Sequence, residues 1–164
     1  MGFFDKLKKT DGERGDWSVF SPVSGRVVPM KSIEDEVFSE GILGVCCGIE
    51  PECETVVSPI DGQVIEVSET LHAVGIEGDG VEILIHVGID TVDMNGDGFE
   101  VSVKAGDRIK RGESLLKMDR EKIKKAGHPT TVVTVITNSR ELESVKTTER
   151  EQLDAGDELF KIRK

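Results

Sequence analysis

The sequence predicts an all-β fold: an antiparallel β-sandwich built from duplicated hairpin motifs, with very little helix. The segment SPVSGRVVPM at 21–30 returns as SPIDGQVIEV at 58–67, so a structural unit is repeated. Valine and isoleucine recur throughout and 18 glycines supply turns, whereas aromatic residues make up only 4%. The 164 residues suffice for one domain with its own core.

The strands follow from local patterns. In each copy of the repeat, proline opens the unit, glycine permits a turn, and alternating Val or Ile forms a half-buried strand. Further strands are expected in VEILIHVGI at 81–89, FEVSVKA at 99–105 and TTVVTVITN at 130–138.

The rest of the chain adds turns and one helix. KAGDRIKRGESLLKMD at 104–119 is echoed by DAGDELFKIRK at 154–164, where AGD marks a tight turn. DREKIKKAG at 119–127 is predicted to be helical, because an acidic residue opens it, lysines follow and glycine ends it. Residues 139–150 are expected to add another short turn.

The N-terminal segment, residues 1–16, is expected to be flexible, and residues 17–164 to form the folded domain. Phe3, Phe4 and Leu7 share one side of a short amphipathic pattern, which fits either weak membrane contact or a frayed tail. TDGERGD then has the composition of a polar linker.

Charge, hydropathy and cysteine content exclude some classes of function and indicate a cellular compartment. With 32 acidic and 21 basic residues, the net charge of -11 repels nucleic acid and anionic lipid. The longest apolar run, at 81–89, is far shorter than the roughly 20 residues that span a bilayer. No secretory signal is readable, and three cysteines cannot all pair, so a reducing cytoplasm is expected. Cys46, Cys47 and Cys53 are expected around a turn, as buried small hydrophobes.

Two histidines offer chemistry. Alternation along 81–89 turns His86 away from the apolar face, and the GDG turn at 78–80 allows His72 to meet it across neighbouring strands. One imidazole could then act as a nucleophile while the other binds the transferring group, with the Thr70 hydroxyl orienting His72. A surface histidine, a structural pair and a surface metal site stay open, although zinc would need a third ligand. His128, near the expected helix end, is interpreted as structural.

An acidic segment has the pattern of a transient protein interface. Glu34, Asp35, Glu36 and Glu40 surround apolar residues that include Phe38 and Ile42. An apolar centre with a polar rim is typical of such surfaces. No glycine-rich phosphate loop is present, and no cofactor or metal is predicted.

These residues resemble a known family. TLHAVGIEGDGVEILIHVGIDTV at 70–92, with the two SPxxG repeats, resembles the glucose-type IIA phosphocarriers of the bacterial sugar phosphotransferase system. The resemblance covers roughly residues 17–164 and implies an antiparallel β-sandwich with two histidines in a shallow depression. By position, it implies that His86 accepts the phosphoryl group, that His72 is needed for onward transfer, and that Thr70 is the hydroxyl bonded to His72.

The same resemblance implies partners. Phe38, Ile42, Leu84, Asp90 and Val92 fall at positions of a docking face, the donor would be phospho-HPr, and the acceptor would be a IIB domain of a sugar transporter. Transporters, permeases or metabolic enzymes would be regulatory targets. The start of the chain is similar to the MGxFDKLK segment of free-standing members, which favours peripheral contact with the inner membrane face.

Two other functions remain open on the sequence. SPVSGRVV and KAGDRIKRGESLLKM also resemble the strands of biotinyl- or lipoyl-type carrier domains, in which Lys122 would lie near the modified position. However, a biotin acceptor lysine is normally flanked by methionines, and DREKIKK has the pattern of a helix. A non-catalytic regulatory module would take up no phosphate at all.

Overall fold

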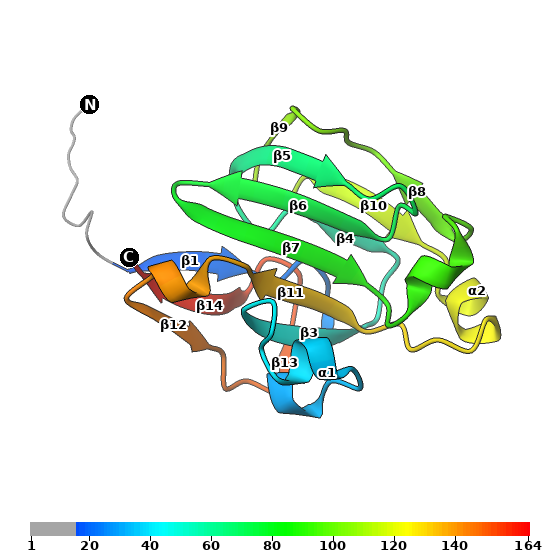
Figure 1. The fold of residues 1–164 in the computed structure, drawn as a ribbon, viewed down its shortest axis with the longest axis horizontal. Coiled ribbons are helices and arrows are strands. Elements are labelled where there is room, and N and C mark those ends of the chain that lie inside the picture. The colour runs from blue at the N-terminus through cyan, green and yellow to red at the C-terminus, as the bar shows by residue number, and fades with distance from the viewer. Residues whose placement is uncertain (1–15) are drawn as a thin grey trace.

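The computed structural model describes residues 16–164, and these form a sandwich of antiparallel sheets, as predicted (Figure 1). The large sheet has eight strands, in spatial order β13 (Gln152–Leu153), β2 (Gly25–Val28), β3 (Val45–Pro51), β11 (Val132–Ile136), β7 (Val81–Val87), β6 (Ala73–Gly78), β5 (Gly62–Val67) and β9 (Arg108–Ile109). The predicted N-terminal segment lies outside the described residues, apart from Asp16.

Two three-stranded sheets complete the sandwich. One contains, in order, β1 (Trp17–Phe20), β14 (Glu158–Arg163) and β12 (Ser144–Thr147), and the other contains β4 (Thr55–Val57), β10 (Ser114–Met118) and β8 (Phe99–Val101). The helices are short: α1 (Glu36–Ser39), α2 (Arg120–Lys125), and the 3-10 helices η1 (Met30–Ser32), η2 (Thr91–Met94) and η3 (Ser139–Glu141). Within residues 16–164, no helix has the length and apolar character to cross a membrane.

The repeat in the sequence is also a repeat in the structure. Ser21 and Ser58 open equivalent turns, in which each hydroxyl donates a hydrogen bond of 2.7 Å to the carbonyl two residues further on. Gly25 and Gly62 then lie against a carbonyl of the neighbouring strand, where a Cβ atom would come within 1.9 Å and 2.3 Å. Any side chain there would collide with the backbone, which explains the recurring glycine.

The similar segments at 104–119 and 154–164 are structurally equivalent in a different register from their sequence alignment. Both AGD segments form turns, with Gly106 and Gly156 at φ 97° and 94°. The amide of Gly156 donates to the carbonyl of Ser21 at 2.9 Å, and its counterpart in the other half is the amide of Gly112, which donates to Ser58 at 2.9 Å. The equivalent turns are therefore KRGE and DAGD, and not the two AGD segments.

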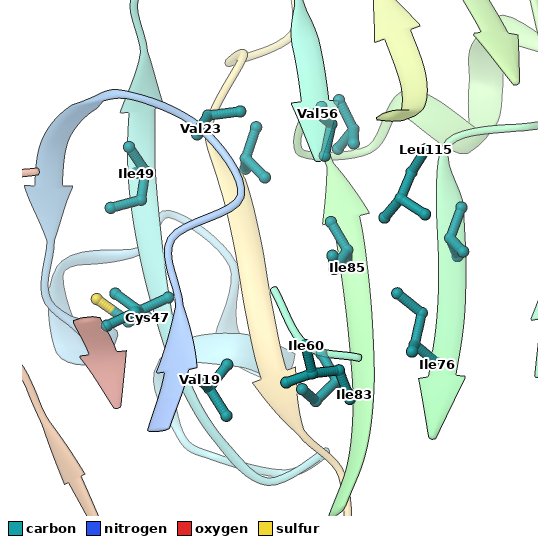
Figure 2. Close-up of a cluster of buried hydrophobic side chains, with 14 of the residues drawn as sticks. Val19, Val23, Cys47, Ile49, Val56, Ile60, Ile76, Ile83, Ile85 and Leu115 are labelled. Atoms are coloured by element: carbon teal, nitrogen blue, oxygen red, sulfur yellow. The ribbon is translucent and has the colours of Figure 1, made fainter. Parts of the chain in front are cut away.

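Two apolar cores lie on opposite faces of the large sheet. The main core fills the space between the sheets, where Ile83 and Ile85 of β7 meet residues such as Val19 and Leu115 (Figure 2). The smaller core lies on the outer face beneath the segment with η1 and α1, and contains Val28, Ile33, Phe38, Cys46, Ile89, Val133 and Val135. Leu84 of β7 is half-buried and packs against this smaller core.

The cysteine segment corrects one prediction. Cys46 and Cys47 lie on strand β3 and not at a turn, whereas Cys53 lies in the bend at 52–54 that joins β3 to β4. Cys46 and Cys47 are buried, as expected, but they face opposite sides of the strand, toward the smaller and the main core respectively. Cys53 is half-buried and packs against the main core.

Among the remaining elements, the predicted helix at 119–127 is confirmed as α2. It begins where the carboxylate of Asp119 accepts a hydrogen bond from the amide of Lys122 at 3.1 Å. The short turn expected within 139–150 is present as η3, but the edge strand β12, which follows it and pairs with β14, was missed on the sequence. The strand expected at 99–105 is β8 and covers only Phe99–Val101. Helix α1 was not predicted from the sequence.

Candidate functional site

Strand β7 presents His86 on the outer face of the large sheet. Its alternation is as predicted: Val81, Ile83, Ile85 and Val87 are buried in the main core, whereas Leu84 and His86 are half-buried on the other face. The antiparallel register pairs His86 with Val133 of β11 and with Ala73 of β6.

His72 reaches His86 from the loop before β6. At the far end of the β6–β7 hairpin, Asp79 and Gly80 both adopt left-handed φ values, 54° and 84°, and reverse the chain. Because His86 pairs with Ala73, the preceding residue His72 lies beside it. The ring centroids of His72 and His86 are 4.7 Å apart, with the ring planes at 81°. The structure therefore brings the two predicted imidazoles together.

One hydrogen bond determines the tautomer of His86. Its Nδ1 lies 2.9 Å from the carbonyl oxygen of Gly88. A carbonyl can only accept, so Nδ1 carries the proton and Nε2 keeps its lone pair. Gly88 can place its carbonyl there because it has φ 81°, and a Cβ at this position would lie 2.3 Å from the methyl group of Thr91. Gly88 in HVGIDTV thus allows the hydrogen bond that orients His86, two residues earlier.

Thr70 contacts the other histidine, as expected. Its Oγ1 lies 2.7 Å from Nδ1 of His72, and the hydroxyl of Ser68 lies 3.5 Å from the same nitrogen. Ser68 was missed on the sequence. Its hydroxyl also accepts from the amide of Ala73 at 3.2 Å, which closes the loop between β5 and β6.

Burial keeps both imidazoles neutral. Burial, with a smaller contribution from the neighbouring His72, lowers the pKa of His86 to about 4, against opposing contributions from the bond to Gly88 and the carboxylates of Asp35 and Asp90. Burial also lowers the pKa of His72, against an opposing hydrogen bond to the backbone of Thr70. Near pH 7 the free lone pair on His86 is therefore available, as a nucleophile requires.

We expect His86 to titrate with a midpoint near pH 4 in the folded protein, well below the ordinary value of about 6.5. Because the neutral form is favoured, the ring stays uncharged as the pH falls from 7 and gains its proton only near pH 4. Ring nitrogen shifts from ¹⁵N NMR between pH 8 and pH 3.5 measure this, with exposed imidazole as the reference. A midpoint at 6.5 or above would contradict the desolvated site.

The predicted docking residues divide into two groups. Ile42 is 57% exposed and Val92 50%, Asp90 is exposed, and Leu84 is half-buried. Phe38, however, is only 4% exposed, so the expectation that it lies on the docking surface needs correction. Its ring instead contacts His86, with the centroids 5.0 Å apart in an edge-on arrangement, and supports the imidazole from the smaller core.

A groove beside the histidines was missed on the sequence. It encloses about 410 Å³ over β5, β6 and β7, and Leu84 belongs to its lining. Ile65, 51% exposed, contributes apolar surface, and Glu66 and Glu82 contribute charge. Ile65 points outward because the register of β5 shifts between Val64 and Glu66, a bulge that simple alternation does not reveal.

Other chemistry-bearing side chains do not join the site. Burial raises the pKa of the Cys46 thiol to about 11 and that of Cys47 to about 12, so both are unreactive. His128 follows α2, where its amide bonds to the carbonyl of Ile123. Lys122 lies on α2 and pairs with Asp97 at 2.9 Å, so it is not at a hairpin tip. In the part of the chain that the structure describes, no group of three or more His, Cys, Asp or Glu is arranged to hold a metal ion.

Comparisons with known proteins agree with this site. The profile of the family described as "phosphoenolpyruvate-dependent sugar phosphotransferase system, EIIA 1" matches residues 17–142. The chain belongs to this EIIA family. It is 38% identical over 146 residues to the glucose-specific EIIA component of Bacillus cereus, a match that covers 88% of each chain.

Longer relatives contain the same domain. The EIIA chain is 36% identical over 152 residues to the beta-glucoside-specific EIIBCA component of Halalkalibacterium halodurans, and the match spans 92% of this chain but only 24% of that protein. The fold of the present chain superposes on the glucose permease IIA from Mycoplasma capricolum with a TM-score of 0.77. The sequences are 30% identical, and the match covers 98% of this chain and 99% of the other. The EIIA fold is thus found both alone and as part of larger proteins.

Proposed function

We propose that this EIIA chain is a phosphocarrier of the sugar phosphotransferase system, with residues 17–164 as the carrier domain. In the proposed reaction, His86 accepts a phosphoryl group from phospho-HPr and passes it to a IIB domain. The observation that supports this best is the pair of adjoining imidazoles, His72 buried and His86 half-buried, in which the Gly88 carbonyl holds the proton of His86 on Nδ1.

Phosphate uptake then needs only His86 as nucleophile. Nε2 of His86 uses its lone pair to form a bond to phosphorus, while the N–P bond of the donor phosphohistidine breaks in line and the donor imidazole takes back its electron pair. The phosphohistidine on His86 is a covalent intermediate. Attack by the second encounter partner breaks its N–P bond and returns the lone pair to Nε2, so atoms and electrons balance over the cycle.

His72 is the group that stabilises the phosphoryl oxygens. For its Nε2 to donate a hydrogen bond, Nδ1 must act as the acceptor, and the Thr70 hydroxyl at 2.7 Å is placed to donate to it. An imidazole can also take on positive charge as the charge on the moving phosphoryl group develops. No metal is required for either role.

The surface around the site suits a basic protein partner. Exposed apolar side chains lie on the two segments that approach His86: Val37, Ile42 and Leu43 near Phe38, and Val92 after Asp90. Asp35 and Asp90 on the same segments are close enough to His86 to raise its pKa. A shallow site admits a partner's phosphohistidine or reactive cysteine, and an acidic rim favours partners with positive charge. We place this exchange in the cytoplasm, with peripheral membrane contact through residues 1–9 as part of the proposal.

Intact-mass analysis tests the proposal. The protein is incubated with phosphoenolpyruvate, enzyme I and HPr, and then treated with acid. We expect one phosphate to be gained, to be lost in acid, and to map to His86. A larger group on a lysine would indicate a biotinyl or lipoyl carrier, and no gain by a folded protein with its cognate HPr would indicate a non-catalytic regulatory module.

A further inference from the structure

The loop that carries Thr70 and His72 contains a leucine in an unfavourable conformation. Residues 68–72 join β5 to β6. The loop is closed by backbone hydrogen bonds from the amide of Leu71 to the carbonyl of Ser68 (2.9 Å) and from the amide of Ser68 to the carbonyl of Ala73 (3.0 Å). Leu71 adopts φ 64°. Left-handed positions in hairpin loops are usually occupied by glycine or asparagine, because the Cβ of other residues crowds the following carbonyl.

The side chain of Leu71 holds this conformation in place. It is half-buried and packs against the main core. It also lies against Gly96 in the segment that follows η2: a Cβ atom at Gly96 would be 3.5 Å from Cδ1 of Leu71. The apolar contact therefore opposes the tendency of the backbone to relax.

We propose that Leu71 is a positioning residue for onward phosphoryl transfer, an inference that rests on the proposed function. Leu71 lies between the two partners of the 2.7 Å contact, and its left-handed backbone brings Oγ1 of Thr70 onto Nδ1 of His72. If residue 71 relaxes, this contact is lost and the proton of His72 is no longer confined to Nε2. Uptake at His86 does not use this contact.

Two substitutions separate conformation from packing. Leu71→Ala removes the anchor and leaves a residue that disfavours left-handed φ, so onward transfer should slow about tenfold while phosphate uptake is unchanged. Leu71→Asn also removes the anchor, but asparagine tolerates this conformation, and transfer should return to within about twofold of the wild type. If Leu71 acted only by apolar burial, asparagine would be at least as harmful as alanine.

Asp79→Ala is the matched control, because Asp79 has φ 54° at the opposite end of β6, away from the histidines. It should alter thermal stability without changing either half-reaction. The ring ¹⁵N shifts of His72 provide a readout independent of activity: one tautomer is expected in the wild type and Leu71→Asn, and a mixture in Leu71→Ala.

Specific outcomes overturn the inference. The positioning role is contradicted if Leu71→Ala transfers phosphate onward at the wild-type rate and keeps a single His72 tautomer. It is also contradicted if Leu71→Ala loses uptake and onward transfer to the same extent. If the wild type takes up no phosphate, the proposed function fails, and the tautomers of the two variants still decide the positioning role.

Discussion

Replacement of His86 by alanine is expected to abolish phosphate uptake, lowering its rate at least about a thousandfold to background. His86 is the half-buried imidazole whose Nδ1 proton is held by Gly88, so Nε2 is the ring nitrogen with a free lone pair. The neighbouring His72 has Nδ1 engaged by Thr70 and is assigned to donate from Nε2, so it does not substitute as a nucleophile. Intact mass after incubation with phosphoenolpyruvate, enzyme I and HPr measures the effect.

Two control variants distinguish loss of the nucleophile from misfolding. His86→Gln fills more of the space beside the Phe38 ring and should be equally inactive. His128→Ala removes the histidine after α2 and should be phosphorylated like the wild type. Full phosphorylation of a folded His86→Ala protein would show that another side chain is the acceptor.

Replacement of His72 by glutamine is expected to separate the two half-reactions. Uptake should stay within a fewfold of the wild type, because attack requires only the lone pair of His86. Onward transfer should fall by roughly 10²–10³, the range found when one group that stabilises transition-state charge is lost. The glutamine amide can donate a hydrogen bond, but it cannot take on charge as the phosphoryl group leaves.

Single-turnover experiments measure onward transfer separately from uptake. His72→Gln is first phosphorylated, then mixed with IIB domains from glucose- and beta-glucoside-specific transporters, the two classes represented among the relatives. Thr70→Val, which keeps the size of the side chain but removes the hydroxyl, serves as a milder companion and should show a smaller loss in the same step. Normal onward transfer by phosphorylated His72→Gln would contradict the separate roles.

Much of the framework was predictable from sequence because local rules specify it. Period-two alternation placed Ile83 and Ile85 in the core and His86 on the other face, and tertiary structure did not change this. The two SPxxG units marked the repeat, although their glycines are required by close backbone contacts at the start of β2 and β5 and not, as expected, by a turn. Asp119 and the lysines after it marked α2, because a short helix is specified by its cap.

The failures have physical reasons. Phe38 has an apolar side chain within an acidic segment, a pattern that does not distinguish an exposed contact from a residue folded under the segment. Residues 144–147 have weak strand character and form β12 because β14 offers a pairing edge. Ile65 faces outward because of a bulge in β5, and a bulge depends on both paired strands.

The sequence by itself therefore determined the fold class, the internal repeat and the pairing of the strand that carries His86 with the strand that follows His72, since these depend on periodicity and turn residues close in the chain. Only the tertiary structure decided the tautomer of His86, the depressed pKa values and the left-handed backbone of Leu71. Each of these depends on burial or on a contact with a specific carbonyl, hydroxyl or glycine. Such contacts exist only once the sheets and the loops flanking them have packed together.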